Sequence, residues 1–254
     1  MKSPELEITN NDDAQESPEL LRVRYRIRFS KTDLLRWTSH RDLARLWERL
    51  LRRAQLNLSM TEGFHPKPRV GFPSALALGT ESLDEVVEID LAEELAPQVL
   101  LDRLADDHQP GLTIKSVQRI PVEAGKAKLQ RSDFQVALPD GVSPDELRSN
   151  IEQFLGQETV TIMRKDKPLT VSVKKQINNV MIENGMLMFS LIAADAASLR
   201  PSDVLDLLSA SDWIERGTKI TRSAVILAKE CEPNSDAPLA VATSLPASDP
   251  PTAN

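Results

Sequence analysis

The residues best suited to chemistry gather in one loop, TEGFHPKPRVGFPSALALG, which spans residues 61–79. Gly63 permits a turn, and two prolines hold His65 and Lys67 in an extended conformation. Phe64 is predicted to fold onto the core as an anchor. A stiff loop that carries this many reactive side chains is more often a functional element than a simple connection.

Two histidines in or near the loop leave several kinds of chemistry open. His40, Glu62 and His65 could form a two-histidine, one-carboxylate metal site, but no shared helix gives them ligand spacing. His40 and His65 could act as a general acid and base, although no nucleophile or carboxylate pair lies nearby in the sequence. A structural loop, or a loop that binds a partner, is the simpler interpretation. We therefore name His40 and His65 as catalytic candidates only, and we expect no metal site. Enzymatic activity stays open, and a non-catalytic role is favoured.

A second candidate surface is basic, although the formal net charge of the chain is −7. Residues 22–69 contain 13 lysines and arginines against 4 acids. Within them, the polar side of a predicted helix over 40–55 carries Arg41, Arg45, Arg49, Arg52 and Arg53. This side is either a solvated helix face or a patch that contacts RNA phosphates or an acidic protein. The loop adds further candidate RNA- or ligand-binding residues, namely Gly63, Phe64, His65, Lys67 and Arg69.

The elements that would position these residues alternate between strands and helices. The first half is predicted to contain strand 22–30, helix 40–55, strand 84–91, helix 96–107 and strand 112–120. Ser39 and Asp42 have the spacing of a capping box at the start of the first helix. With a short strand in the loop, this order is that of a ferredoxin-like unit, which we assign to residues 21–122.

The second half repeats the pattern. It is predicted to contain strand 133–138, a helix that begins at Pro144 behind the cap Ser143, strands near 159–163, 170–182 and 186–193, helix 201–209 and strand 219–227. We therefore expect an α+β protein of two tandem ferredoxin-like units, the second over residues 130–229. Residues 1–20, which are acidic, and 233–254 are predicted to be disordered tails.

One strand raises a question about charge. Residues 22–29, RVRYRIRF, alternate apolar and basic side chains, and the basic side carries Arg22, Arg24, Arg26 and Arg28. This row either holds an anion outside the molecule or pairs with acids inside it. The predicted strand 84–91 would lie antiparallel beside it, with Glu88 and Asp90 on the same face, where each pair contributes about 0.2–1 kcal/mol. These two acids account for about half of the row and leave two arginines in excess.

Composition narrows the class of protein. No stretch approaches the roughly 20 apolar residues that span a bilayer, and the acidic N-terminus does not resemble a signal peptide. One cysteine, Cys231, excludes an internal disulfide and a cysteine-based metal site. The sequence has no Walker loop, no GxGxxG after a strand and no CxxxCxxC, HExxH or GxSxG motif. We expect a cytoplasmic protein with no common cofactor and no membrane partner.

Three stretches of the chain resemble one known family. They are SHRDLARLWERLLRRA from residue 39, EGFHPKPR with ALALGTES in residues 62–82, and LRPSDVLDLL followed by ITRSAVIL in residues 199–227. Over about residues 22–228 the chain resembles the radical-SAM-associated (radical-SAM-linked) family of bacterial proteins, a domain of unknown function. Where that family usually has Ser-His-Leu-Asp, this chain has Arg41 in place of the leucine.

The resemblance implies a partner rather than an activity. Members of that family are fused to, or encoded beside, a radical SAM protein with a cobalamin-binding-type region. This chain lacks the three-cysteine cluster motif, so radical chemistry would belong to a separate radical SAM protein. The family carries over no catalytic residues. The tandem layout is also similar to that of CRISPR RNA-processing proteins, but their glycine-rich C-terminal loop is missing, since ERGTKITR holds one glycine.

These observations predict a non-catalytic adaptor or RNA-binding protein that works with a separate radical SAM enzyme in the modification of RNA or a ribonucleoprotein. One alternative is a pure protein–protein interaction module, in which the same arginines dock on an acidic surface of that partner. A second alternative is an RNA-processing enzyme that uses His40 and His65.

Overall fold

The computed structural model describes residues 21–194 and 198–230. The two tails that the sequence predicts to be disordered, 1–20 and 233–254, lie outside the described residues. The N-terminal half contains β1 (Val23–Lys31), the 3-10 helix η1 (Asp33–Trp37), α1 (His40–Arg53), β2 (Val70–Gly71), β3 (Glu81–Leu91), α2 (Pro97–Ala105) and β4 (Leu112–Ile120). The strands β1, β3 and β4 and the helices α1 and α2 lie where the sequence predicts them, within three residues at each end, whereas η1 is not predicted.

The C-terminal half follows a linker, residues 121–128, that includes the 3-10 helix η2 (Val122–Ala124). It contains β5 (Leu129–Ala137), α3 (Pro144–Leu155), β6 (Thr159–Arg164), β7 (Lys167–Ser172), α4 (Val173–Gln176), β8 (Ile177–Glu183), β9 (Met186–Ile192), α5 (Pro201–Leu207), η3 (Ser211–Trp213) and β10 (Ile220–Leu227). Helices and strands mix in this way in both halves of the described chain, so the predicted α+β class is confirmed.

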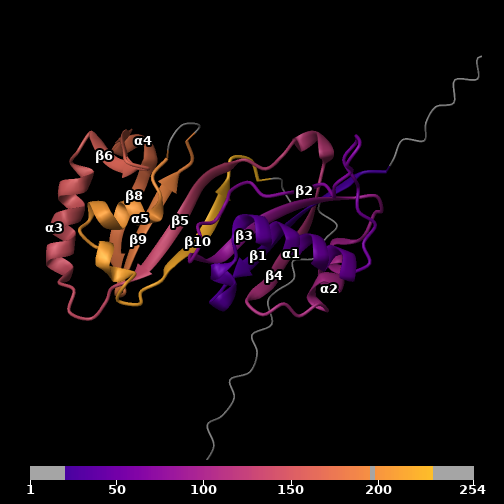
Figure 1. The fold of residues 1–254 in the computed structure, drawn as a ribbon, viewed down its shortest axis with the longest axis horizontal. Helices are drawn as coiled ribbons and strands as arrows, with labels where there is room; N and C mark the ends of the chain where they lie inside the picture. The colour runs from indigo at the N-terminus through magenta and orange to yellow at the C-terminus, as the bar shows by residue number, and fades with distance from the viewer. Residues whose placement is uncertain (1–20, 195–197, 231–254) are drawn as a thin grey trace, which may run out of the picture.

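One eight-stranded sheet runs through both halves. Its strands lie in the order β4-β1-β3-β10-β5-β9-β8, and the short β2 also pairs with β3. The halves meet where β10 pairs with the start of β3 in parallel, at Thr221 and Arg222. The other pairings of described strands are antiparallel. Figure 1 shows the halves side by side, with α1 and α2 in one and α3, α4 and α5 in the other.

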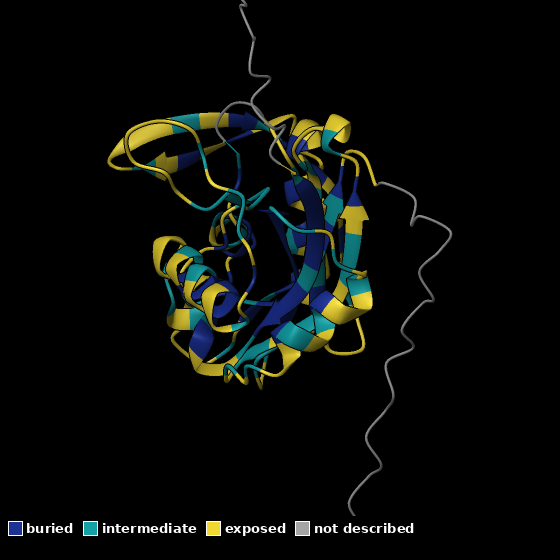
Figure 2. Ribbon diagram, turned by 90° about the vertical axis from the view of Figure 1, so that its right-hand side faces the viewer, coloured by how far each residue is buried: buried dark blue, intermediate teal, exposed yellow. Residues whose placement is uncertain are grey.

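Each half has its own apolar core. In the N-terminal half, Tyr25, Ile27 and Phe29 of β1 pack with Trp47 and Leu50 of α1, and all five are fully buried. The rings of Phe29 and Trp47 meet edge to face at 4.9 Å. A second cluster lies under α3 and α5 in the C-terminal half. Figure 2 shows buried strands on one side and, beside them, helices whose outer faces are exposed.

The prediction of one strand over residues 170–182 is wrong. The structure divides this stretch into β7, one turn of helix α4 and β8, and β7 pairs with β6 in a separate two-stranded sheet. Val171 and Val173 are buried at strand spacing, but Gln176, Ile177 and Val180 follow at spacings of three, one and three residues. That change of period is typical of a helical turn, and it redirects the chain into the main sheet.

The start of α1 depends on one hydroxyl. Ser39 is the N-cap residue, and its side chain accepts a hydrogen bond from the backbone N–H of Asp42 (3.2 Å). The substitution Ser39→Ala should lower the free energy of unfolding by about 1 kcal/mol, measured by urea denaturation. Ser39→Thr keeps the acceptor and serves as the control. Equal stability of the alanine variant and the native protein would contradict this role.

Candidate nucleic-acid interface

The arginine row on β1 is paired inside the molecule. The register of β1 and β3 sets Arg24 opposite Asp90 and Arg26 opposite Glu88. Arg24 Nε lies 2.8 Å from Asp90 Oδ1, and Arg26 Nη2 lies 2.9 Å from Glu88 Oε1. All four side chains are buried. The predicted pairing of the row with these two acids is therefore confirmed.

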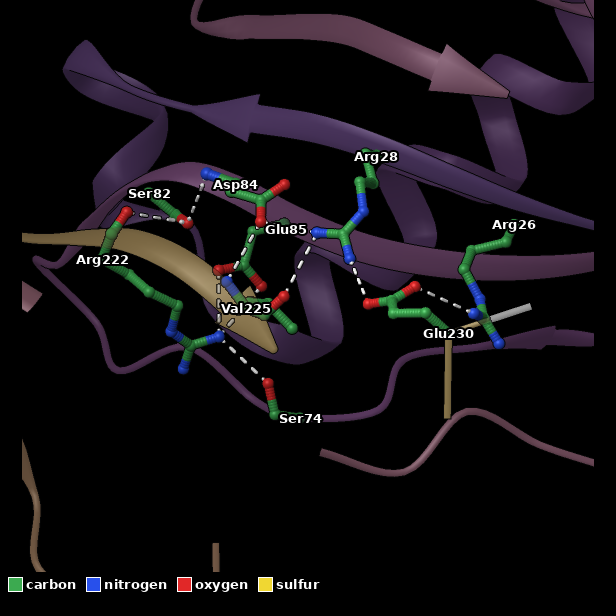
Figure 3. Close-up of polar contacts among 9 residues, drawn as sticks. All are labelled: Arg26, Arg28, Ser74, Ser82, Asp84, Glu85, Arg222, Val225 and Glu230. Carbon is green, nitrogen blue, oxygen red and sulfur yellow. Dashed lines mark hydrogen bonds and ion pairs between the residues drawn. The ribbon is translucent and has the colours of Figure 1, made fainter. Parts of the chain in front are cut away.

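The predicted excess of two arginines is wrong. Arg22 donates to Asp90 Oδ2 (2.6 Å), so one carboxylate serves two guanidinium groups. Arg28 donates to Asp84 Oδ2 (2.6 Å) and to Glu230 Oε1 (2.7 Å), as Figure 3 shows. Asp84 lies on the same face of β3 as Glu88, three residues into the strand, and Glu230 lies beyond β10. The row thus meets four acids rather than two.

The linker between the halves covers this face of the sheet. Arg24 Nη1 donates to the carbonyl of Gly125 (2.6 Å), and the N–H of Ala127 donates to Glu88 Oε2 (2.9 Å). Arg28 also donates to the carbonyl of Val225 in β10 (3.2 Å). Arg24 and Arg26 therefore form a buried polar core between the sheet, the linker and the end of β10, whereas Arg22 and Arg28 are paired with acids but stay partly exposed.

A second buried charge cluster joins the two halves. Arg222 of β10 binds both carboxylate oxygens of Glu85 in β3, at 3.0 and 3.2 Å, and the hydroxyl of Ser74 (Figure 3). Burial raises the pKa of Glu85, and Arg222 opposes that shift. Lys31, also buried, donates to the carbonyl of Thr38 (2.9 Å), and burial lowers its pKa. Sequence analysis missed this cluster, although Glu85 falls on the apolar side of its strand with Val87 and is a charge out of place there.

The arginines of α1 face solvent, as the site prediction requires. Arg41, Arg45, Arg49, Arg52 and Arg53 are all exposed. Arg45 pairs with the exposed Asp42 at 3.4 Å, and Arg53 pairs with Asp107 at 2.5 Å. Within residues 21–194 and 198–230, no carboxylate lies within ion-pair distance of Arg41, Arg49 or Arg52.

The loop after α1 is a short hairpin built on β3. The N–H of Ser59 donates to the carbonyl of Asp90 (2.9 Å), and a β-bridge joins Met60 to Pro68. Thr61 and Lys67 close the tip through two hydrogen bonds, from Thr61 N to the Lys67 carbonyl (2.8 Å) and from Lys67 N to the Thr61 hydroxyl (3.0 Å). Residues 62–66 therefore project beyond the sheet.

The prediction that Phe64 anchors this loop on the core is wrong. Its relative exposure is 102%, because the ring lies at the tip of the hairpin, beyond the closing bonds of Thr61 and Lys67. Gly63 beside it has a φ of +111°, a conformation that suits glycine. His65 and Lys67 are exposed next to it, and Arg69 is half-buried at the base, where Nε donates to the Met60 carbonyl (3.0 Å).

The two histidines do not form a site in the described residues. The ring of His40 meets Phe72 edge to face at 5.3 Å, whereas His65 lies at the hairpin tip. Glu62 reaches only Arg69, at 3.8 Å. No group of three or more histidine, cysteine or acidic residues that could hold a metal occurs in the part of the chain that the structure describes. The acid–base pair stays a prediction without geometric support.

A family model described as "Uncharacterized protein conserved in bacteria (DUF2344)" matches residues 24–201 of the 254-residue chain. The chain belongs to this family. The description agrees with the expected domain of unknown function and assigns no partner or activity. Among the described residues of this DUF2344 protein, no helix is long and apolar enough to cross a membrane.

Other comparisons give weak likenesses. No curated protein matches the DUF2344 chain. A solved structure titled "Crystal Structure of a Cbf5-Nop10-Gar1 Complex" is similar with a TM-score of 0.38 and 10% identity, over 79% of this chain and 48% of that one. A solved structure of an unknown protein from Galdieria sulphuraria is similar with a TM-score of 0.25 and 12% identity. The match covers 82% of this chain and 100% of that one. The chain thus spans about half the length of the first of these proteins, and likeness at this level carries no argument.

Removal of a carboxylate that pairs with a buried arginine should lower the free energy of unfolding more than removal of one in an exposed pair. Asp90→Asn would leave the buried Arg24 without its charged partner, so we expect a loss of about 3–5 kcal/mol in the free energy of unfolding. Asp145→Asn breaks the exposed pair with Arg148 and should cost less than about 1 kcal/mol. Urea denaturation of both variants measures the difference. Similar small losses in both would show that the row is not a stabilising core.

Proposed function

We propose that this DUF2344 protein is a non-catalytic adaptor that binds RNA and works in the cytoplasm with a separate radical SAM enzyme, in the modification of RNA or a ribonucleoprotein. The family motifs quoted from the sequence support the partner. The exposed arginine stripe of α1 supports the ligand, and it is the observation that carries the proposal. The single cysteine is in keeping with a reducing compartment.

The stripe consists of Arg41, Arg45, Arg49 and Arg52. Spacings of four, four and three residues place the four side chains on one face of α1. Their Cα atoms therefore span about 16 Å along the helix axis, at a rise of about 1.5 Å per residue. Guanidinium groups at this spacing suit a polyanion because each can bind a phosphate through two parallel hydrogen bonds.

The hairpin tip adds a different kind of contact. Phe64 offers an exposed aromatic face, and His65 and Lys67 lie beside it on the same tip. Single-stranded nucleic acids bind proteins by stacking bases on such rings while basic groups follow the backbone. The hairpin begins six residues after α1 ends, so both contacts come from one short stretch of the chain.

We also propose that the two halves are tandem ferredoxin-like units. In the N-terminal half the strands lie in the order β4-β1-β3 with β2 beside β3, and in the C-terminal half in the order β10-β5-β9-β8. If the four strands of each half are numbered by their order along the chain, both halves have the same spatial order, namely fourth, first, third, second. In this numbering β6 and β7 are an insertion in the C-terminal half. The shared order supports one architecture used twice.

The first test of RNA binding removes the unpaired arginines. The triple variant Arg41→Ala, Arg49→Ala and Arg52→Ala should bind single-stranded RNA more weakly. The slope of log affinity against log salt should fall in magnitude by about 2, because three phosphate contacts are lost at about 0.7 each. Fluorescence anisotropy with a labelled oligonucleotide at several salt concentrations measures both.

A matched control removes the same charge elsewhere, with Arg119, Arg148 and Arg216 replaced by alanine. These arginines are paired with Glu94, Asp145 and Asp212, so this variant should keep the native slope. Equal losses in both triple variants would mean that only net charge matters. Absence of RNA binding by the native protein, with salt-sensitive binding to the radical SAM partner, would favour the protein–protein module instead.

The second test addresses the hairpin tip. Phe64→Ala should weaken binding to single-stranded RNA by about 1–3 kcal/mol if one base stacks on the ring. Because the ring is fully exposed, the variant should unfold within about 0.5 kcal/mol of the native protein. Phe64→Trp keeps an aromatic face and should retain affinity in the same anisotropy assay. Unchanged affinity of the alanine variant would remove Phe64 from the interface.

A further inference from the structure

A cleft of about 830 Å³ lies where the two halves meet. Residues 74–80 and the end of η1 line it from the N-terminal half, and β5, β10 and the start of α5 line it from the C-terminal half. Its volume falls within the range of small-molecule sites in proteins, about 300–1,000 Å³. It shares no residue with the α1 stripe or the hairpin tip.

The charged side chains among the described residues that line this cleft are all basic. Arg36, Arg200, Lys219 and Arg222 line it, and no aspartate or glutamate is among its described lining residues. Glu81 lies close by but is shared, since it binds both Arg36 (3.4 Å) and Lys219 (3.1 Å). Two carboxylates, Glu81 and Glu85, thus meet three of the four cations. The cleft therefore keeps a positive excess that favours an anionic ligand.

Two buried polar atoms in the wall of the cleft have no hydrogen-bond partner in the described structure. They are Nε of Arg222 and the hydroxyl oxygen of Ser132, on side chains that are 95% and 97% buried, from relative exposures of 5% and 3%. Arg222 and Ser132 come from the paired strands β10 and β5. Buried donors left unpaired destabilise a fold, so these two donors favour a ligand that brings acceptor oxygens into the cleft.

The rim of the cleft carries an aromatic surface. Trp37 is 58% exposed, and the guanidinium of Arg36 lies 5.1 Å from its ring centre. The indole also rests on Gly79, where a Cβ atom would come within 3.0 Å of the ring, and more than half of the Trp37 surface stays exposed. Deeper in the cleft, Phe134, Leu199 and Ile220 form an apolar wall. A flat aromatic group can therefore stack on Trp37 above apolar walls.

We propose that this cleft binds a nucleoside phosphate. The base stacks on the indole of Trp37, and the phosphate accepts hydrogen bonds from Ser132 and Arg222 while Arg200 and Lys219 balance its charge. An inorganic anion would leave the aromatic rim and apolar wall unused. The ligand is either a free nucleotide or the phosphorylated end of an RNA, which offers the same chemistry. This inference is independent of the proposed role of α1.

Tryptophan fluorescence of the full chain tests the site. The indoles of Trp47 and Trp213 are buried, so quenching by added nucleotide reports on Trp37. The probes are AMP, GMP, CMP and UMP, a 5′-phosphorylated oligoribonucleotide, and adenosine and inorganic phosphate as half-ligands. We expect at least one nucleotide or the phosphorylated oligonucleotide to bind, with the two half-ligands at least about tenfold weaker.

Three variants separate binding from folding. Ser132→Ala should weaken binding about tenfold and leave the melting temperature unchanged or higher, because it removes an unpaired buried hydroxyl. Trp37→Ala should abolish the quenching and weaken binding measured by calorimetry. Leu34→Ala, an exposed residue of η1 outside the cleft, should change nothing.

Binding of free nucleotide supports a metabolite site, and binding of the phosphorylated oligonucleotide alone supports an RNA-end site. The second result must persist in the Arg41, Arg49 and Arg52 alanine variant, which separates this cleft from the α1 surface. The inference is overturned if no probe binds, if Ser132→Ala and Trp37→Ala bind like the native protein, or if Ser132→Ala lowers the melting temperature, which would make the hydroxyl structural.

Discussion

The structure depends on the neutralisation of a row of four arginines, of which Arg24 and Arg26 are buried. Burying a charge is strongly unfavourable unless it is paired and hydrogen-bonded, and one face of β1 carries Arg24, Arg26 and Arg28, with Arg22 directly before the strand. Asp84, Glu88 and Asp90 of β3, with Glu230 after β10, supply the matching charges. The linker closes over this face through hydrogen bonds to Arg24 and Glu88. Charge pairing therefore fixes the register of β1 on β3 and helps to fix how the C-terminal half sits on the N-terminal half.

The same residue type thus has two uses within 30 residues of chain. The arginines on β1 pair with acids inside the fold. Those on α1 remain in solvent because the helix buries only its opposite face, with Trp47 and Leu50. Arginine suits both uses, since its planar group forms paired hydrogen bonds with carboxylates inside and phosphates outside. The net charge of a segment consequently overstates the charge of its surface, and the basic surface of residues 22–69 is mainly that of α1.

Local periodicity predicts much of this protein. The alternation in β1 and β3 predicts both strands and even the Arg24–Asp90 and Arg26–Glu88 pairs. The cap at Ser39 and the helical spacing of Leu43, Leu46 and Trp47 predict α1. The predictions that fail concern contacts between residues that are far apart in the chain. Glu230 lies about 200 residues from Arg28, and the Arg222–Glu85 pair and the cleft beside it exist only where the halves meet. The position of Phe64 depends on how the loop closes, which residue types alone do not determine.

The separation of structural from solvent-facing arginines is the central claim, and NMR spectra of the arginine Nε–H groups test it most directly. The account predicts that Arg24 and Arg26, whose Nε–H groups bind buried carboxylates, exchange slowly with water and keep their chemical shifts when RNA is added. Signals from Arg41, Arg49 and Arg52 should exchange rapidly and change on addition of RNA. Rapid exchange at Arg24 and Arg26, or shifts there caused by RNA, would contradict the account.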